Sequence, residues 1–87
     1  MQVKTILKNM YFVKHGDRTG QFLIFLDYDA DKKIYSALGL PESEPVYISD
    51  NDVQKAITHK VLEHVELLPE DVYEQCRSEF NYRQNNK

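Results

Sequence analysis

The chain of 87 residues is poor in cysteine, glycine and proline, with one Cys, three Gly and three Pro. The single thiol, Cys76, excludes an intramolecular disulfide and a cysteine cluster that binds zinc. No apolar run approaches the roughly 20 residues that a membrane helix requires, and residues 1–4 do not resemble the start of a signal peptide. These absences predict a soluble, cytoplasmic protein in a reducing compartment.

What is present predicts a folded domain. Hydrophobic residues make up 41% of the chain, and ten residues are aromatic, six Tyr and four Phe. That composition is typical of a globular protein and not of a disordered segment. Because a chain of this size buries only about 60–65% of its unfolded surface, we expect residues 1–87 to form a single domain with one core.

The most specific pattern is a buried strand at residues 21–28. Six of its eight residues are apolar and five are consecutive, which predicts burial on both faces and a central position in a sheet. A turn at residues 15–20 with two glycines joins it to a first strand within residues 3–14. Since apolar side chains lie on both faces of that first strand, we expect either a bulge near Lys8 and Asn9 or a strand that lies partly between two layers.

Two further strands complete the β-rich first half. They are predicted at residues 33–38 and 46–48, with a loop at residues 39–45 that contains a glycine and two prolines. All connections are short, so an antiparallel meander over residues 1–48 is the simplest topology.

Residues 49–80 change to a helical or mixed character. Ser49 and Asp52 have the spacing of a capping box, which predicts a short helix that ends near Thr58. Residues 61–68 fit either a helix or a strand. We favour a fifth strand there, because its valines are β-branched.

A last helix is the clearest element of the second half. Pro69 suits the first helical position, and Val72, Cys76 and Phe80 recur every four residues as an apolar stripe. We expect residues 81–87 to be a polar tail that frays.

Together these elements predict an α+β fold. It consists of a small, strongly bent antiparallel sheet or partial barrel of four to five strands, covered by two short helices from the C-terminal half. The strand order is similar to that of an SH3-like barrel, with an early turn and a short helix before the last strand. The likeness concerns connectivity only, because no motif of that family is present.

A run of acids near the middle of the chain resembles a calcium loop in part. Asp27, Asp29 and Asp31 match the first half of an EF-hand, but Lys32 and Leu38 stand where that loop requires Gly and Glu. We interpret the acids as a solvated hairpin tip. Weak binding of a divalent ion is the alternative.

The remaining reactive residues form no catalytic pattern. His59 and His64 are five residues apart, a spacing that suits zinc neither on a helix nor on a strand. In a strand, His64 is expected to point to solvent, opposite Val65 and Leu67. Cys76 lies on the apolar stripe, so a buried, inert thiol is expected. With no nucleophile elbow or phosphate loop, we expect no enzymatic activity, cofactor or metal.

Charge is distributed unevenly along the chain. Residues 1–26 carry four cations and one acid, a net charge of +3, whereas residues 34–87 carry five cations and ten acids, a net charge of −5. Such a distribution steers charged partners. We therefore predict a small non-enzymatic protein-interaction module, an inhibitor or adaptor that acts through its acidic C-terminal surface; an ordinary solvated surface is the alternative. The candidate protein-binding residues are Tyr47, Glu63, Glu66, Glu70, Tyr73 and Glu74, with Tyr82 as a further aromatic.

Two other functions compete with this one. The first is nucleic-acid binding by the basic N-terminal hairpin, where cations alternate with rings; the pI of about 5.5 argues against it, since nucleic-acid-binding domains usually have a pI above about 9. The second is a structural role through self-association. The partner is expected to be an unidentified protein or a second copy, not a membrane, and the composition suits a bacterial or phage accessory protein. The candidate nucleic-acid residues are Lys4, Lys8, Tyr11, Phe12, Lys14 and Arg18.

Overall fold

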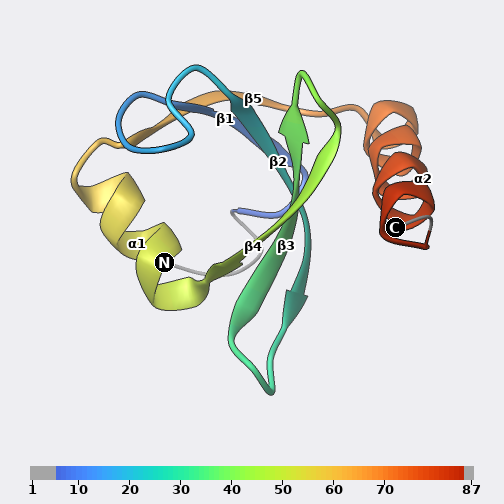
Figure 1. Cartoon of the computed structure of the whole chain (residues 1–87), viewed down its shortest axis with the longest axis horizontal. Coiled ribbons are helices and arrows are strands. Elements are labelled where there is room, and N and C mark those ends of the chain that lie inside the picture. Colours follow the sequence, from blue (N-terminus) through green and yellow to red (C-terminus); the bar gives the residue numbers. More distant parts are fainter. Residues whose placement is uncertain (1–5, 86–87) are drawn as a thin grey trace.

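The computed structural model describes residues 6–85, and the fold is α+β as predicted. All strand pairs are antiparallel, and the described strands form one unclosed sheet in the order β4-β3-β2-β1-β5. The two helices stand at opposite sides of this sheet (Figure 1). The elements are, in chain order, β1 (Asn9–Val13), β2 (Phe22–Asp29), β3 (Ile34–Leu40), β4 (Glu44–Ser49), α1 (Asp50–Thr58), β5 (Leu62–Leu67) and α2 (Glu70–Asn85).

The central strand β2 is buried on both faces, as its sequence predicts. Leu23 and Phe25 point into a core cluster that includes Val53 of α1, while Ile24 and Leu26 point into a second cluster formed with α2. The expectation of one core is therefore wrong: the described residues form two core clusters, one on each face of the sheet. Each helix covers one of them.

Helix α1 begins as its sequence predicts. Ser49 is the N-cap, and its Oγ accepts a hydrogen bond from the backbone N–H of Asp52 at 3.1 Å. The helix ends at Thr58, and Lys60 follows with a positive φ of 59°. That left-handed residue reverses the chain so that β5 can return beside β1.

The first strand is shorter than expected. Lys8 has a φ of 69°, a left-handed conformation that an extended strand does not contain, so β1 begins only at Asn9. The bulge predicted near Lys8 and Asn9 lies instead between Met10 and Tyr11, in the pairing with β5. The part of the prediction that covers residues 3–5 falls outside the described residues.

The predicted loop at residues 39–45 is mostly strand. Gly39 belongs to β3 and Pro45 to β4, which leaves a turn at residues 41–43. Pro45 is tolerated because β4 is an edge strand of the sheet. The composition predicted a loop correctly but overstated its length.

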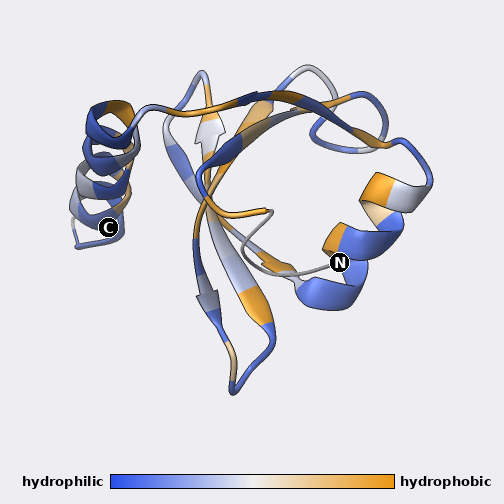
Figure 2. Ribbon diagram, turned by 180° about the vertical axis from the view of Figure 1, so that it is seen from behind, coloured by the Kyte–Doolittle hydropathy of each residue, from blue (hydrophilic) through white to orange (hydrophobic). Residues whose placement is uncertain are grey.

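The C-terminal half confirms one prediction and corrects another. Residues 62–67 are a strand, as favoured above. Helix α2, however, continues to Asn85, so the fraying predicted for residues 81–85 is wrong; residues 86–87 lie outside the described part. An ion pair between Arg83 Nε and Glu79 Oε1, 2.9 Å apart and four residues apart in sequence, supports the last turns. Figure 2 shows that most of α2 is hydrophilic apart from the stripe that contacts the sheet.

Candidate functional site

Among the described strands, β5 is an edge strand of the sheet and pairs with β1 alone. Two backbone hydrogen bonds frame this pair. At one end the N–H of Lys14 donates to the carbonyl of Val61 at 2.8 Å, and at the other the N–H of Leu68 donates to the carbonyl of Lys8 at 2.9 Å. They establish which peptide groups of β5 face β1.

The alternation of an antiparallel ladder gives the direction of the remaining groups. The peptide groups of Glu63 and Glu66 face β1, and those of His64 and Leu67 face away from it. Among residues 6–85, no backbone group bonds to this outer edge of β5. The edge thus offers unpaired donors and acceptors to another chain.

Two large apolar side chains are exposed on the same strand. Val65 is 45% exposed and Leu67 is 64% exposed. His64 is exposed, as the sequence predicts. Val65 and Leu67 were expected on the opposite face, but they are exposed as well, because the bulge in this pair leaves Val65 without an opposite residue and shifts the alternation. The His64 ring also contacts β1: it is 5.4 Å from the ring of Tyr11, and its Nε2 is 2.7 Å from Asn9 Oδ1.

Exposed carboxylates follow β5 into α2, and we call Glu63, Glu66, Glu70 and Glu74 the acidic strip. Glu63 Oε2 is 3.2 Å from Lys14 Nζ, and Glu70 Oε2 is 2.7 Å from Lys8 Nζ, with all four side chains exposed. This hydrogen bond from Lys8 to the Glu70 carboxylate raises the pKa of the Lys8 ammonium. Glu66 forms no ion pair with any other residue in 6–85. The acidic strip is therefore only partly neutralised.

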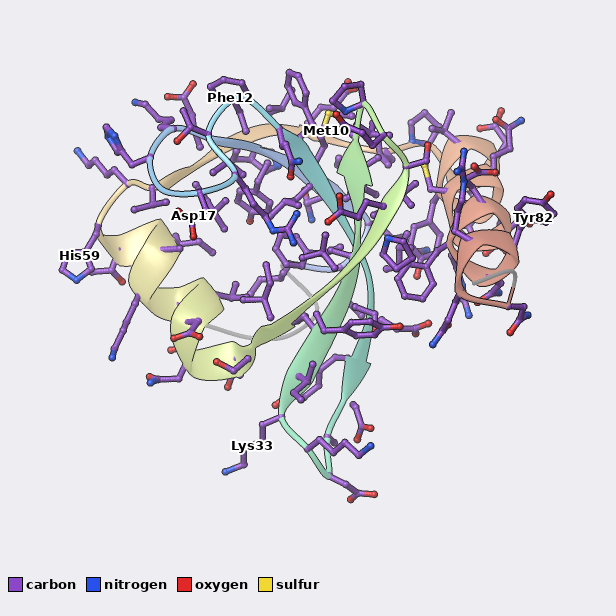
Figure 3. All side chains as sticks on the ribbon, in the orientation of Figure 1. Met10, Phe12, Asp17, Lys33, His59 and Tyr82 are labelled. Atoms are coloured by element: carbon purple, nitrogen blue, oxygen red, sulfur yellow. The ribbon has the colours of Figure 1, made fainter. Side chains whose placement is uncertain are left out.

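The predicted tyrosines do not join the acidic strip. Tyr73 is only 5% exposed, and its hydroxyl donates to the carbonyl of Leu26, so the structure corrects the prediction of an exposed interface anchor. Tyr47 lies on β4, the other edge of the sheet, where its ring contacts Phe80 with centroids 5.9 Å apart. Tyr82 points away from the sheet on the outer side of α2 (Figure 3).

The cations of the proposed nucleic-acid surface are neutralised by other elements. Lys8, Lys14 and Arg18 each pair with a glutamate, from α2, β5 and β4 respectively, and Arg18 Nη1 lies 2.9 Å from Glu44 Oε1. Lys4 lies outside the described residues. The described hairpin therefore presents no group of unpaired cations.

The two rings predicted to stack on bases are occupied as well. Tyr11 is buried on the α1 side of the sheet and meets Phe25 edge to face at 5.5 Å between ring centroids. Phe12 is half-buried and packs on Phe22 at 5.1 Å. Both rings are therefore engaged in packing contacts within the sheet.

The acidic run between β2 and β3 forms a turn. Asp29 Oδ1 accepts hydrogen bonds from the backbone N–H groups of Asp31 at 3.0 Å and Lys32 at 3.2 Å, the pattern of an Asx turn. Within residues 6–85, no group of three or more His, Cys, Asp or Glu side chains is placed to hold a metal ion. Partial burial raises the pKa of the Cys76 thiol, which lowers its thiolate fraction and its reactivity.

A pocket with an apolar floor opens between α1 and the turn that joins β1 to β2. Its volume is about 230 Å³. No sequence signal could have found it, because its walls come from separate segments that only the bent sheet brings together. The lining residues are Val13, His15, Asp17, Arg18, Leu23, Ile48, Asp52, Val53, Ala56, Val61 and Leu62.

None of the helices within residues 6–85 is long and apolar enough to cross a membrane. Comparison of the chain with protein-family models, curated proteins and solved structures finds no match.

Proposed function

We propose that this chain is a small, non-enzymatic protein-binding module that takes up an extended, basic segment of a partner protein as an additional strand on β5. The observation that carries the proposal is the outer edge of β5, whose peptide groups have no backbone partner within residues 6–85 and lie beside the exposed side chains of Val65 and Leu67. Strand addition draws affinity from main-chain hydrogen bonds and specificity from the side chains that flank them.

The acidic strip selects the charge of the partner. Glu63 and Glu66 lie on the face of β5 that carries Phe12 and Met10 on β1, so an added strand places its own side chains beside these carboxylates. Opposite charges there stabilise the pair, and like charges destabilise it. A segment that alternates Lys or Arg with apolar residues fits both the carboxylates and the exposed Val65.

The same charges disfavour pairing between two copies of β5. In an antiparallel pair centred on the strand, Glu63 and Glu66 of one copy lie near the same residues of the other. Self-association through this edge is therefore the weaker alternative.

The other edge of the sheet is protected against strand addition. The Asp50 N–H donates to the Lys33 carbonyl at 2.8 Å, and the ladder alternation from that bond turns the nitrogen of Pro45 outward, opposite Leu38 on β3. Proline has no N–H to offer an added strand, a common way to blunt an edge. Within the described sheet, this makes β5 the more suitable edge.

We also infer that the sheet is an SH3-like partial barrel. The strand order β4-β3-β2-β1-β5, with α1 between β4 and β5, supports this likeness of connectivity. The inference concerns the fold and carries no family function.

Two short synthetic peptides test the proposed function. One alternates Lys with Val and the other alternates Glu with Val, and binding to the full chain is measured by calorimetry and by amide NMR shifts. We expect the basic peptide alone to bind and to shift the amides of His64 and Leu67. Equal binding of the acidic peptide, or shifts confined to other elements, overturns the proposal.

A matched pair of variants separates the contribution of the Leu67 N–H to peptide affinity from that of the Leu67 side chain. Leu67→Ala removes the exposed side chain but keeps the outward N–H, whereas Leu67→Pro removes that N–H without breaking a bond to β1. We expect Leu67→Pro to bind the basic peptide at least about tenfold more weakly than Leu67→Ala, with similar thermal unfolding of the two variants. Equal affinity of the two excludes strand addition at this edge.

A pull-down from cell lysate, with and without nuclease treatment, compares this function with nucleic-acid binding. Retention of one protein in both halves, and its loss with Leu67→Pro, supports the proposal. Retention that depends on nucleic acid contradicts it.

A further inference from the structure

The pocket beside α1 is connected to the edge of β5 through Leu62. The side chain of Leu62 lines the pocket, while the ladder alternation turns its peptide group outward, like that of His64. A strand added to β5 therefore ends beside the mouth of this pocket.

The interior of the pocket suits one apolar group. Its floor is formed by core side chains from five elements, among them Leu23, Val53 and Ala56. The volume of about 230 Å³ exceeds the roughly 150 Å³ of an apolar cavity that admits benzene. It is smaller than the ~300–1,000 Å³ of pockets for whole small molecules. One large apolar side chain fits this space.

The polar residues that line the pocket are His15, Asp17, Arg18 and Asp52. Asp17 and Asp52 line it, and neither carboxylate forms an ion pair with another residue in 6–85. Arg18 also lines it, but its guanidinium pairs with Glu44 at 2.9 Å. Figure 3 shows Asp17 between the β1–β2 turn and α1. A cation on the ligand is favoured at this position.

We infer that the pocket holds one large apolar side chain of the same basic partner segment, followed by a lysine or arginine that faces Asp17 and Asp52. This inference rests on the proposed strand addition to β5. Because every strand pair in the sheet is antiparallel, the C-terminal end of an antiparallel partner strand reaches Leu62. The apolar anchor thus follows the basic strand in the partner sequence.

Two extended peptides test the pocket. Each carries the Lys–Val alternation, and one ends in Phe-Lys where the other ends in Ser-Lys. We expect the Phe-Lys peptide to bind about tenfold or more tightly and to shift the amides of Val53 and Ala56. Equal affinity of the two peptides overturns the pocket inference and leaves strand addition standing.

Two variants of α1 test the pocket, one with the pocket filled and one as a control. Ala56→Phe fills the pocket from within, and Thr58→Phe adds the same ring at an exposed position of the same helix that does not line it. We expect only Ala56→Phe to abolish the advantage of the Phe-Lys peptide. Retention of that advantage in a folded Ala56→Phe variant contradicts the inference.

Two further measurements test the pocket separately from protein stability and from strand addition to β5. The double variant Asp17→Asn with Asp52→Asn is expected to bind peptides that end in Phe-Lys and in Phe-Ser with equal affinity. If it still prefers the Phe-Lys peptide as strongly as the wild-type chain does, Asp17 and Asp52 do not bind the lysine. The blocked dipeptide N-acetyl-Phe-Lys-amide is expected to shift pocket amides in the wild-type chain. If the dipeptide binds while the basic strand peptide does not, the pocket is confirmed and the proposed strand addition is wrong.

Discussion

The Tyr73 hydroxyl of α2 donates a hydrogen bond to the backbone carbonyl of Leu26 in β2. This carbonyl is available because the register of β2 against β3 shifts between Phe25 and Asp27, which leaves Leu26 opposite no residue. A buried backbone carbonyl without a partner is unfavourable. The Tyr73 side chain therefore supplies the hydrogen bond that the irregular pairing of β2 leaves unmade at Leu26, and it attaches α2 to the sheet.

Replacing Tyr73 with Phe is expected to destabilise the fold by about 1–3 kcal/mol, because the Leu26 carbonyl is left without its donor. Urea denaturation measures the change. Tyr47→Phe is the matched control, since its ring is half-exposed and a surface change is expected to stay within about 0.5 kcal/mol. Equal effects of the two variants would show that this hydrogen bond contributes little.

Alkaline pH is expected to destabilise the protein through Tyr35. Burial, with a further contribution from the Asp50 carboxylate, raises the pKa of Tyr35 from 10.0 to about 12. Because the folded pKa is above the unfolded one, the contribution to stability is complete below pH 10 and is lost as the pH rises toward about 12. Its size is about 3 kcal/mol. Denaturation from neutral to alkaline pH, compared with that of Tyr35→Phe, measures this contribution, and identical slopes for the two proteins contradict the assignment.

Removal of the N-cap of α1 is expected to weaken the fold and the pocket that α1 borders. Ser49→Ala deletes the acceptor of the Asp52 N–H, which costs about 0.5–2 kcal/mol. Thermal unfolding measures the loss. The control is Ser78→Ala, at an exposed position of α2. It is expected to be neutral or slightly stabilising, because Ala has a higher helix propensity than Ser. A neutral Ser49→Ala variant contradicts the role of the cap.

The ion pair between Lys14 and Glu63 is expected to contribute little to stability. Both side chains are exposed and the Nζ–Oε2 distance is 3.2 Å, so a double-mutant cycle with Lys14→Ala and Glu63→Ala should give a coupling of about 0.2–1 kcal/mol. If the coupling is this small, Glu63 can leave Lys14 and pair with a cation of the partner with little loss of free energy. A coupling well above this range would argue against a role for Glu63 in partner binding.

The local patterns of the sequence were sufficient for the elements that depend on neighbouring residues. The consecutive apolar residues of β2, the Ser49 cap and the four-residue stripe of α2 all appear where they were predicted. Each is encoded within a few positions, because side-chain direction repeats every two residues in a strand and every 3.6 residues in a helix. Some of the errors lie at element ends, where one left-handed residue, Lys8, shortens a strand.

The candidate sites depend instead on contacts between distant residues. Lys8 pairs with Glu70 across 62 positions and Lys14 with Glu63 across 49, so no local pattern showed that the basic hairpin is neutralised. The bulge that exposes Val65 exists only because β5 returns to β1. The sequence by itself determined the first four strands, both helices and the net charge of each half, and left residues 61–68 open between a helix and a strand. Only the tertiary structure decided which tyrosines are buried, which edge stays open and where the pocket lies, because these depend on long-range pairing, whereas the elements depend on local periodicity.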